Sequence, residues 1–97
     1  MDVLRKLQAW YRSQCDGDWE HEFGIKLETL DNPGWSLTID LEGTPLEGEP
    51  YEECREDRTE LNWVRCWVKD RRFKAACGPE NLDDVLSEFL GWAERCT

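Results

Sequence analysis

Two alternating runs of apolar and polar residues, separated by a turn sequence, constrain the fold of this chain more than any other feature. Residues 23–30 and 35–42 place apolar side chains at every second position, the period of a β-strand with one buried face. Between them stands Asn32-Pro33-Gly34, in which proline presets φ at the second turn position and glycine accepts a positive φ at the third. We therefore expect an antiparallel hairpin with one buried and one wet face.

A helix is predicted at each end of the chain. Apolar residues recur at helical spacing over residues 2–14, after Asp2 as N-cap, and again in a C-terminal segment after Asn81. Asp84, the third residue of the second helix, is placed to form a capping box with Asn81. Each amphipathic helix has to bury its apolar stripe, so we expect both helices to cover the same face of one sheet.

Three more strands are predicted between the hairpin and the C-terminal helix. Residues 51–59 suit an acidic edge strand, residues 62–69 alternate strongly, and residues 73–77 return after a turn at Asp70-Arg71. Residues 43–50 are rich in glycine, proline and glutamate, which is typical of a loop.

The expected fold is therefore a single α+β domain over residues 1–97. It is predicted as an antiparallel β-meander of four to five strands flanked by an N-terminal and a C-terminal helix (α-β-β-β-β-β-α). The sheet face turned away from the helices would carry polar residues together with Trp63 and Trp67. A hydrophobic content of 39% excludes a disordered chain.

The net charge is −10, from 22 acidic and 12 basic residues. Such a surface repels nucleic acid and anionic membrane and attracts basic partners, so we expect neither nucleic acid nor membrane as a partner. The six tryptophans in 97 residues also favour a protein partner, because tryptophan concentrates in cores and at recognition surfaces. Together these features favour a protein-binding domain, with a role of the charge in solubility alone as the alternative.

Five cysteines are scattered along the chain without a CxxC pair or a zinc-site spacing. They are Cys15, Cys54, Cys66, Cys77 and Cys96. The first 14 residues carry charges throughout, unlike a signal peptide or a membrane span. We therefore expect a cytoplasmic protein with reduced thiols that uses neither a metal nor another cofactor.

The densest group of side chains that can bear chemistry is Cys15–Glu22 (CDGDWEHE), with four carboxylates and the only histidine. A calcium loop counted from Asp16 would need glycine and glutamate where His21 and Leu27 stand. A nucleophile and base pair of Cys15 and His21 would need a third group and an oxyanion site, and neither is recognisable. We therefore interpret the segment as a turn whose acidic residues face a partner, with a dedicated binding hot spot, metal binding and catalysis as alternatives.

Two further segments admit a functional interpretation. Cys54 is followed by Arg58, as in a sulfurtransferase loop, but the spacing is short and the acidic residues between them would raise the thiol pKa. A charged edge that discourages aggregation is the better account of that segment. The turn before Trp35 could present Asn32 or Trp35 to a partner, although Trp35 begins an apolar stripe and burial is favoured.

Several strings resemble the immunity protein 53 family of bacterial polymorphic toxin systems. They are Trp10-Tyr11, Ser13–His21 (SQCDGDWEH), Gly24-Ile25, Thr29–Trp35 (TLDNPGW), Trp63, Cys66 and Gly78–Leu82 (GPENL). The resemblance covers nearly the whole chain. It departs at Ala75-Ala76-Cys77, where the family pattern leads us to expect more glycine.

The resemblance implies an immunity protein encoded beside a secreted or contact-delivered toxin, binding the toxin domain in the cytoplasm of the producing cell. We expect neutralisation by occlusion without catalysis, and a basic nuclease-type toxin is one candidate partner. The expected contact residues are Asp16, Asp18, Glu20, His21, Trp63 and Trp67. A small thiol-dependent enzyme of sulfurtransferase type and an oligomeric adaptor domain remain as alternatives.

Overall fold

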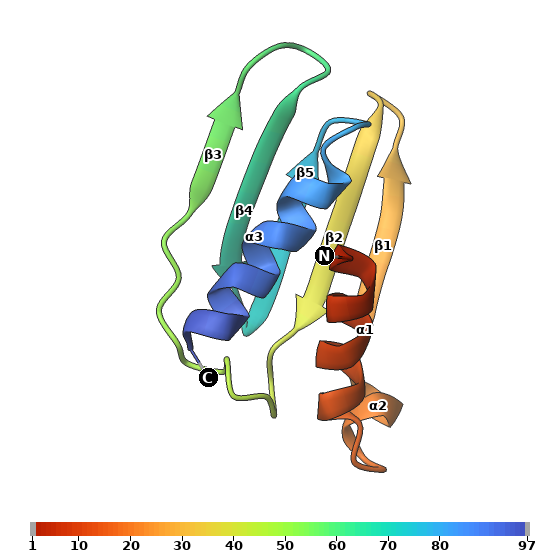
Figure 1. Ribbon diagram of the computed structural model, residues 1–97, viewed down its shortest axis with the longest axis vertical. Coiled ribbons are helices and arrows are strands. Elements are labelled where there is room, and N and C mark those ends of the chain that lie inside the picture. Colours follow the sequence, from red (N-terminus) through yellow and green to blue (C-terminus); the bar gives the residue numbers. More distant parts are fainter. Residues whose placement is uncertain (1, 97) are drawn as a thin grey trace.

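The computed structural model describes residues 2–96, in which five antiparallel strands form one sheet and two long helices lie on one of its faces (Figure 1). The elements are α1 (Val3–Gln14), α2 (Trp19–Glu22), β1 (Ile25–Leu30), β2 (Gly34–Asp40), β3 (Cys54–Asp57), β4 (Trp63–Lys69), β5 (Arg72–Cys77) and α3 (Leu82–Arg95). The predicted α+β class and the two flanking helices are confirmed.

The strand order departs from the expected meander. In the sheet the order is β1-β2-β5-β4-β3, so the last strand in sequence lies in the middle, paired with both β2 and β4. The connection from β2 to β3 therefore crosses below β5 and β4 (Figure 1). Leu46 anchors this connection in the core at 1% exposure, and the Thr44 hydroxyl donates to the carbonyl of Leu41 at 2.7 Å.

The hydrophobic core lies between the sheet and α3. The alternation predicted for β2, β4 and β5 is confirmed, because every second residue of each strand turns toward α3. At its centre Phe73 is fully buried against Phe89 and Trp92, with ring centroids 5.1 and 6.2 Å away. Each such side chain contributes on the order of 1.5–3 kcal/mol by leaving water. By contrast, α1 has no fully buried residue.

The two helices begin differently. Asp2 caps α1 as predicted, since its side chain accepts the N–H of Leu4 at 3.0 Å. The capping box predicted for α3 is not formed. Instead, the buried Asn81 accepts the N–H of Trp63 at 3.2 Å and donates to Asp84 at 2.8 Å. Asn81 therefore ties the start of α3 to the start of β4, because a buried amide needs its hydrogen bonds.

The β1–β2 hairpin forms as predicted, but Gly34 serves a different purpose there. It does not have a positive φ; it opens β2 directly beside β5. A Cβ added at Gly34 would lie 2.3 Å from the carbonyl oxygen of Cys77. The glycine is therefore required by close strand packing and not by turn geometry.

Three of the six tryptophans fasten loops to the body of the protein through their indole N–H groups. Trp19 donates to the carbonyl of Glu42 at 2.8 Å, Trp35 to Pro79 at 3.0 Å and Trp92 to Pro50 at 3.0 Å. Trp35 is half-buried, in line with the burial favoured for it from the sequence. Trp10 of α1 packs edge-on against Phe89, with ring centroids 4.9 Å apart. These four side chains are structural, which leaves Trp63 and Trp67 on the other face of the sheet.

Candidate interaction surfaces

In the segment that we call the acidic turn (residues 15–22), two of the four predicted contact residues, Asp16 and Glu20, bind the backbone of the turn itself. Asp16 accepts the N–H groups of Asp18 and Trp19, both at 2.9 Å, and Glu20 accepts those of Asp16 and Gly17 at 3.0 and 2.9 Å. The hydrogen bonds from Trp19 and Asp18 lower the pKa of the Asp16 carboxyl group, and the backbone N–H groups of Glu20 itself, Asp16 and Gly17 lower the pKa of the Glu20 carboxyl group. Both residues thus shape the turn, which explains the negative charge next to the C-terminal end of α1.

The rest of the acidic turn is held by Trp19, which is 5% exposed. Gly43 passes close to it with φ +80°, and a Cβ there would lie 3.2 Å from the Trp19 ring. Asp18 and His21 are exposed. Cys15 donates to the carbonyl of Tyr11 at 3.4 Å, and across residues 2–96 no hydrogen bond joins it to His21.

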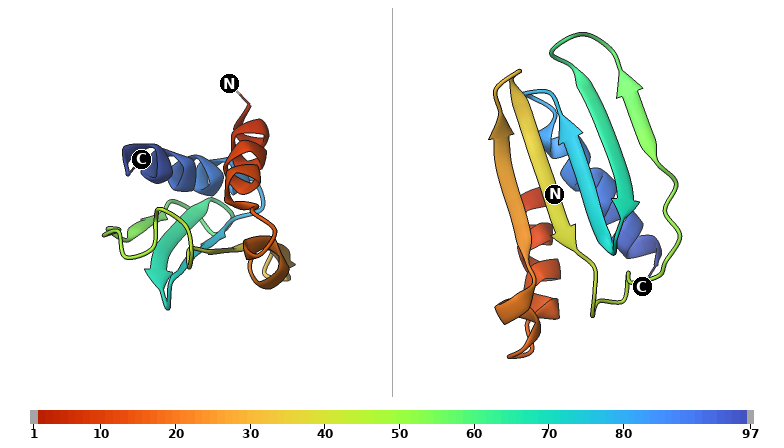
Figure 2. Two further views of the ribbon diagram at one scale, coloured as in Figure 1. Left: turned by 90° about the horizontal axis from the view of Figure 1, so that it is seen from below. Right: turned by 180° about the vertical axis from the view of Figure 1, so that it is seen from behind.

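The second predicted contact region lies on the sheet face opposite the helices. Trp63, Arg65, Trp67 and Lys74 form what we call the open-face patch: the three β4 residues project from one side of their strand, and Lys74 is the register partner of Trp67. The view from behind shows no helix over this face (Figure 2). Trp63 and Trp67 are half-buried, and the Arg65 guanidinium lies 5.8 Å from the centroid of the Trp63 ring.

The open sheet face is basic, although the chain as a whole is strongly acidic. The strand registers place six basic and three acidic side chains on it. The basic residues are Lys26, Arg55, Arg65, Lys69, Arg72 and Lys74, and the acidic ones are Glu28, Asp40 and Asp57. Trp67 therefore stands opposite Lys74 and between Arg65 and Lys69 on its strand, whereas Trp63 stands opposite Asp57. The basic character of the face was missed from the sequence, although strand alternation alone indicates it.

Most of the net negative charge, −6 of −10, lies elsewhere, in what we call the acidic segment (residues 42–60). It contains eight acidic residues and two arginines, Arg55 and Arg58. The segment comprises the β2–β3 connection and the edge strand β3, as expected for an acidic edge. Five of its acidic residues lie in the connection, two in β3 and one after it, so the charge that would steer a basic partner extends from below the sheet to the β3 edge.

A pocket of about 280 Å³ joins the open-face patch to the acidic segment. Its lining residues are Asn32, Asp57, Thr59, Glu60, Trp63 and Arg65. Asp57 accepts a hydrogen bond from Arg55 at 2.9 Å. The pocket thus combines an aromatic ring, two carboxylates and the Arg65 guanidinium, and Asn32 of the β1–β2 turn lines it together with Trp63.

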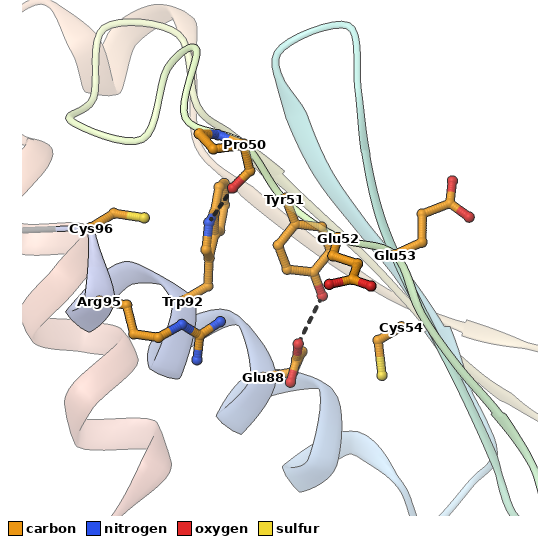
Figure 3. Close-up of a pocket in the computed structure, with 9 residues that line it drawn as sticks. All are labelled: Pro50, Tyr51, Glu52, Glu53, Cys54, Glu88, Trp92, Arg95 and Cys96. Carbon is orange, nitrogen blue, oxygen red and sulfur yellow. Dashed lines mark hydrogen bonds between the residues drawn. The ribbon is translucent and has the colours of Figure 1, made fainter.

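A second pocket, of about 410 Å³, lies between α3 and the chain that enters β3 (Figure 3). Glu88 accepts the hydroxyl of Tyr51 at 3.0 Å there, and Cys54 and Arg95 also line the cavity. Burial raises the pKa of the Cys54 thiol above its ordinary value, and Glu88 and Glu56 raise it further. A thiol in this state is a poor nucleophile.

Alkylation of the folded protein near pH 7 is expected to be slow at Cys54, Cys66 and Cys77. Burial raises the pKa of Cys66 to about 12 and that of Cys77 to about 11, so all three thiols stay protonated. Mass spectrometry after timed exposure to iodoacetamide measures the rates, and the urea-unfolded chain provides the ordinary rate. A single cysteine that reacts faster in the folded protein than in urea would instead support a thiol-dependent enzyme.

The predicted contact residues do not form one site. The acidic turn lies beside the start of β1, whereas β4 begins with Trp63 at the opposite end of the sheet (Figure 1). Among the described residues no group of three or more His, Cys, Asp or Glu side chains is placed to hold a metal ion. Within the same range no helix is both long and apolar enough to cross a membrane.

These features define a small two-layer α+β protein with an open, aromatic sheet face next to an acidic edge. A family model described as Immunity protein 53 matches residues 4–94, and the chain belongs to that family. The family name makes it an immunity protein of a toxin system, which confirms the resemblance seen in the sequence. No curated protein and no solved structure shows significant similarity to the chain.

Proposed function

We propose that this immunity protein binds its cognate toxin domain in the cytoplasm of the producing cell and neutralises it by covering its active surface, without catalysis. The observation that supports the proposal most is the open-face patch. Trp63 and Trp67 are half-buried on a sheet face over which no helix lies (Figure 2). Exposed tryptophan area of this kind is typical of binding hot spots.

The pocket beside Trp63 suits a basic side chain of the toxin. A lysine or arginine placed there would meet the carboxylate of Glu60 beside the Trp63 ring. Asp57 already pairs with Arg55 of this chain at 2.9 Å, and the Arg65 guanidinium lies 5.8 Å from the ring centroid. The acidic segment would draw a basic toxin surface toward this edge of the sheet before contact is made. A nuclease-type toxin, with a cleft shaped for phosphate groups, is one partner that would present such a surface.

The acidic turn has a secondary role in this proposal. Asp16 and Glu20 act by holding the turn in shape, since their carboxylates already accept backbone N–H groups. Asp18 and His21 are exposed and available to a toxin that extends along α1. We place the main contact at Trp63 and Trp67, because their aromatic area is larger and nothing in the fold requires their exposure.

Association kinetics with the toxin domain encoded beside this protein test the proposal. Binding is expected, and its association rate should fall by about tenfold or more between low and high salt, while the dissociation rate changes little. Co-expression should also restore growth to cells that produce the toxin domain. A salt-independent rate would remove charge steering from the mechanism, and the absence of any binding would contradict the function itself.

A further inference from the structure

The outer edge of β1 has the features of a strand that pairs with another copy of itself. It is an edge strand of six residues without proline, and among residues 2–96 no element runs along its outer side, while α2 lies at its lower end (Figures 1 and 2). We propose that β1 pairs antiparallel with β1 of a second copy, around a two-fold axis at Leu27, to form a continuous ten-stranded sheet. This inference is independent of the toxin.

The backbone of β1 is oriented for this pairing. The N–H of Asp40 donates to the carbonyl of Gly24 at 3.1 Å, which fixes the even-numbered residues of the strand as those that bond to β2. The N–H and C=O groups of Ile25, Leu27 and Thr29 therefore point outward. An axis at Leu27 would let these groups form a regular ladder with the same groups of the second copy.

The side chains of β1 are complementary to themselves in that register. Lys26 would stand opposite Glu28 of the second copy and Glu28 opposite its Lys26, so two ion pairs form on the open sheet face. Leu27 would meet its own copy on the helix side, where the sequence places an apolar residue that remains 46% exposed. The pairing would thus bury one of the few large hydrophobic side chains that the fold leaves in water.

The space beside the start of β1 is mostly apolar as well. Leu7, Gln8, Tyr11, Gly24 and Ile25 line a groove of about 350 Å³ between α1 and β1. Tyr11 is 40% exposed there. The edge proposed to pair therefore adjoins an apolar groove that the second copy would help to shield from water.

The opposite edge of the sheet lacks this self-complementarity. β3 has only four residues, and a two-fold axis at Glu56 would place two glutamates directly opposite each other. Arg55 and Asp57 already pair within the chain at 2.9 Å. We therefore expect the dimer to form through β1 and not through β3. Because a ladder of six residues buries little area, the dimer should dissociate on dilution.

Charge reversal gives a sharp test. Sedimentation of the wild-type protein over a concentration series should show its mass rising from 11.5 kDa toward twice that value. Lys26→Glu alone and Glu28→Lys alone each set like charges opposite each other in a homodimer and should stay near the monomer mass at the same concentrations. An equimolar mixture of the two variants restores two opposite-charge pairs, so its mass should rise again.

Amide hydrogen exchange gives a measurement that does not depend on any variant. The amides of Ile25, Leu27 and Thr29 should become protected as the wild-type concentration rises, whereas those of Lys26 and Glu28 are protected by β2 throughout. A wild-type protein that stays monomeric at every concentration would overturn the proposal. The proposal would also be overturned if each single variant, measured alone, associated as strongly as the wild type. Protection of the three amides that appears only after the toxin is added would overturn it too.

Discussion

Replacing Trp63 with alanine is expected to weaken toxin binding by about 2 kcal/mol or more, roughly thirtyfold in Kd. The change removes the aromatic wall of the pocket that Asp57, Glu60 and Arg65 also line, and with it part of the aromatic area on the open sheet face. Isothermal titration calorimetry with the toxin domain measures the loss. Trp67→Ala should weaken binding as well, because both rings lie on the same sheet face.

Two controls make the result interpretable. His21→Ala, in the exposed part of the acidic turn, is expected to change the affinity by no more than a few-fold. Trp63→Phe keeps a ring in the pocket and should retain part of the affinity. Thermal unfolding of each variant shows whether it is folded. If Trp63→Ala binds as tightly as the wild type while His21→Ala does not bind, the interface lies at the acidic turn.

Gly34→Ala is expected to lower the free energy of unfolding by about 1–3 kcal/mol, as overpacking does in tight structures. The new methyl group would lie 2.3 Å from the carbonyl oxygen of Cys77, so β2 and β5 would have to move apart. Gly24→Ala is the matched control, since no atom lies within 4 Å of a Cβ added there. Urea unfolding followed by circular dichroism measures both variants. Equal stabilities would show that the two strands can separate at no cost.

The local elements could be predicted from the sequence because their periods are regular. The helices at both ends, the hairpin around Pro33 and the edge position of β3 follow from alternation, caps and charge alone. The order of the strands could not be predicted in this way. It depends on the long connection that Leu46 anchors in the core, and no local pattern tells which distant strand will be the neighbour of β2.

Part of the candidate site could be predicted, because the alternation along its strands is regular. The alternation along β4 places Trp63 and Trp67 on the open face, and the same rule applied to Arg65 and Lys74 would have shown that the face is basic. The inward orientation of the Asp16 carboxylate could not be foreseen, because a carboxylate at a turn can bind its own backbone or project into water. The sequence alone does not distinguish the two arrangements.

The central position of β5 has a consequence for how this protein can be made. Of the five strands of the sheet, β5 (Arg72–Cys77) is synthesised last, and until it is available the pairs β1–β2 and β3–β4 have no strand to join them. The helix α3 then needs that completed surface to pack on. A nascent or prematurely terminated chain that lacks β5 therefore lacks the complete sheet that carries both tryptophans, and a cell would gain protection only from molecules synthesised beyond β5 and α3.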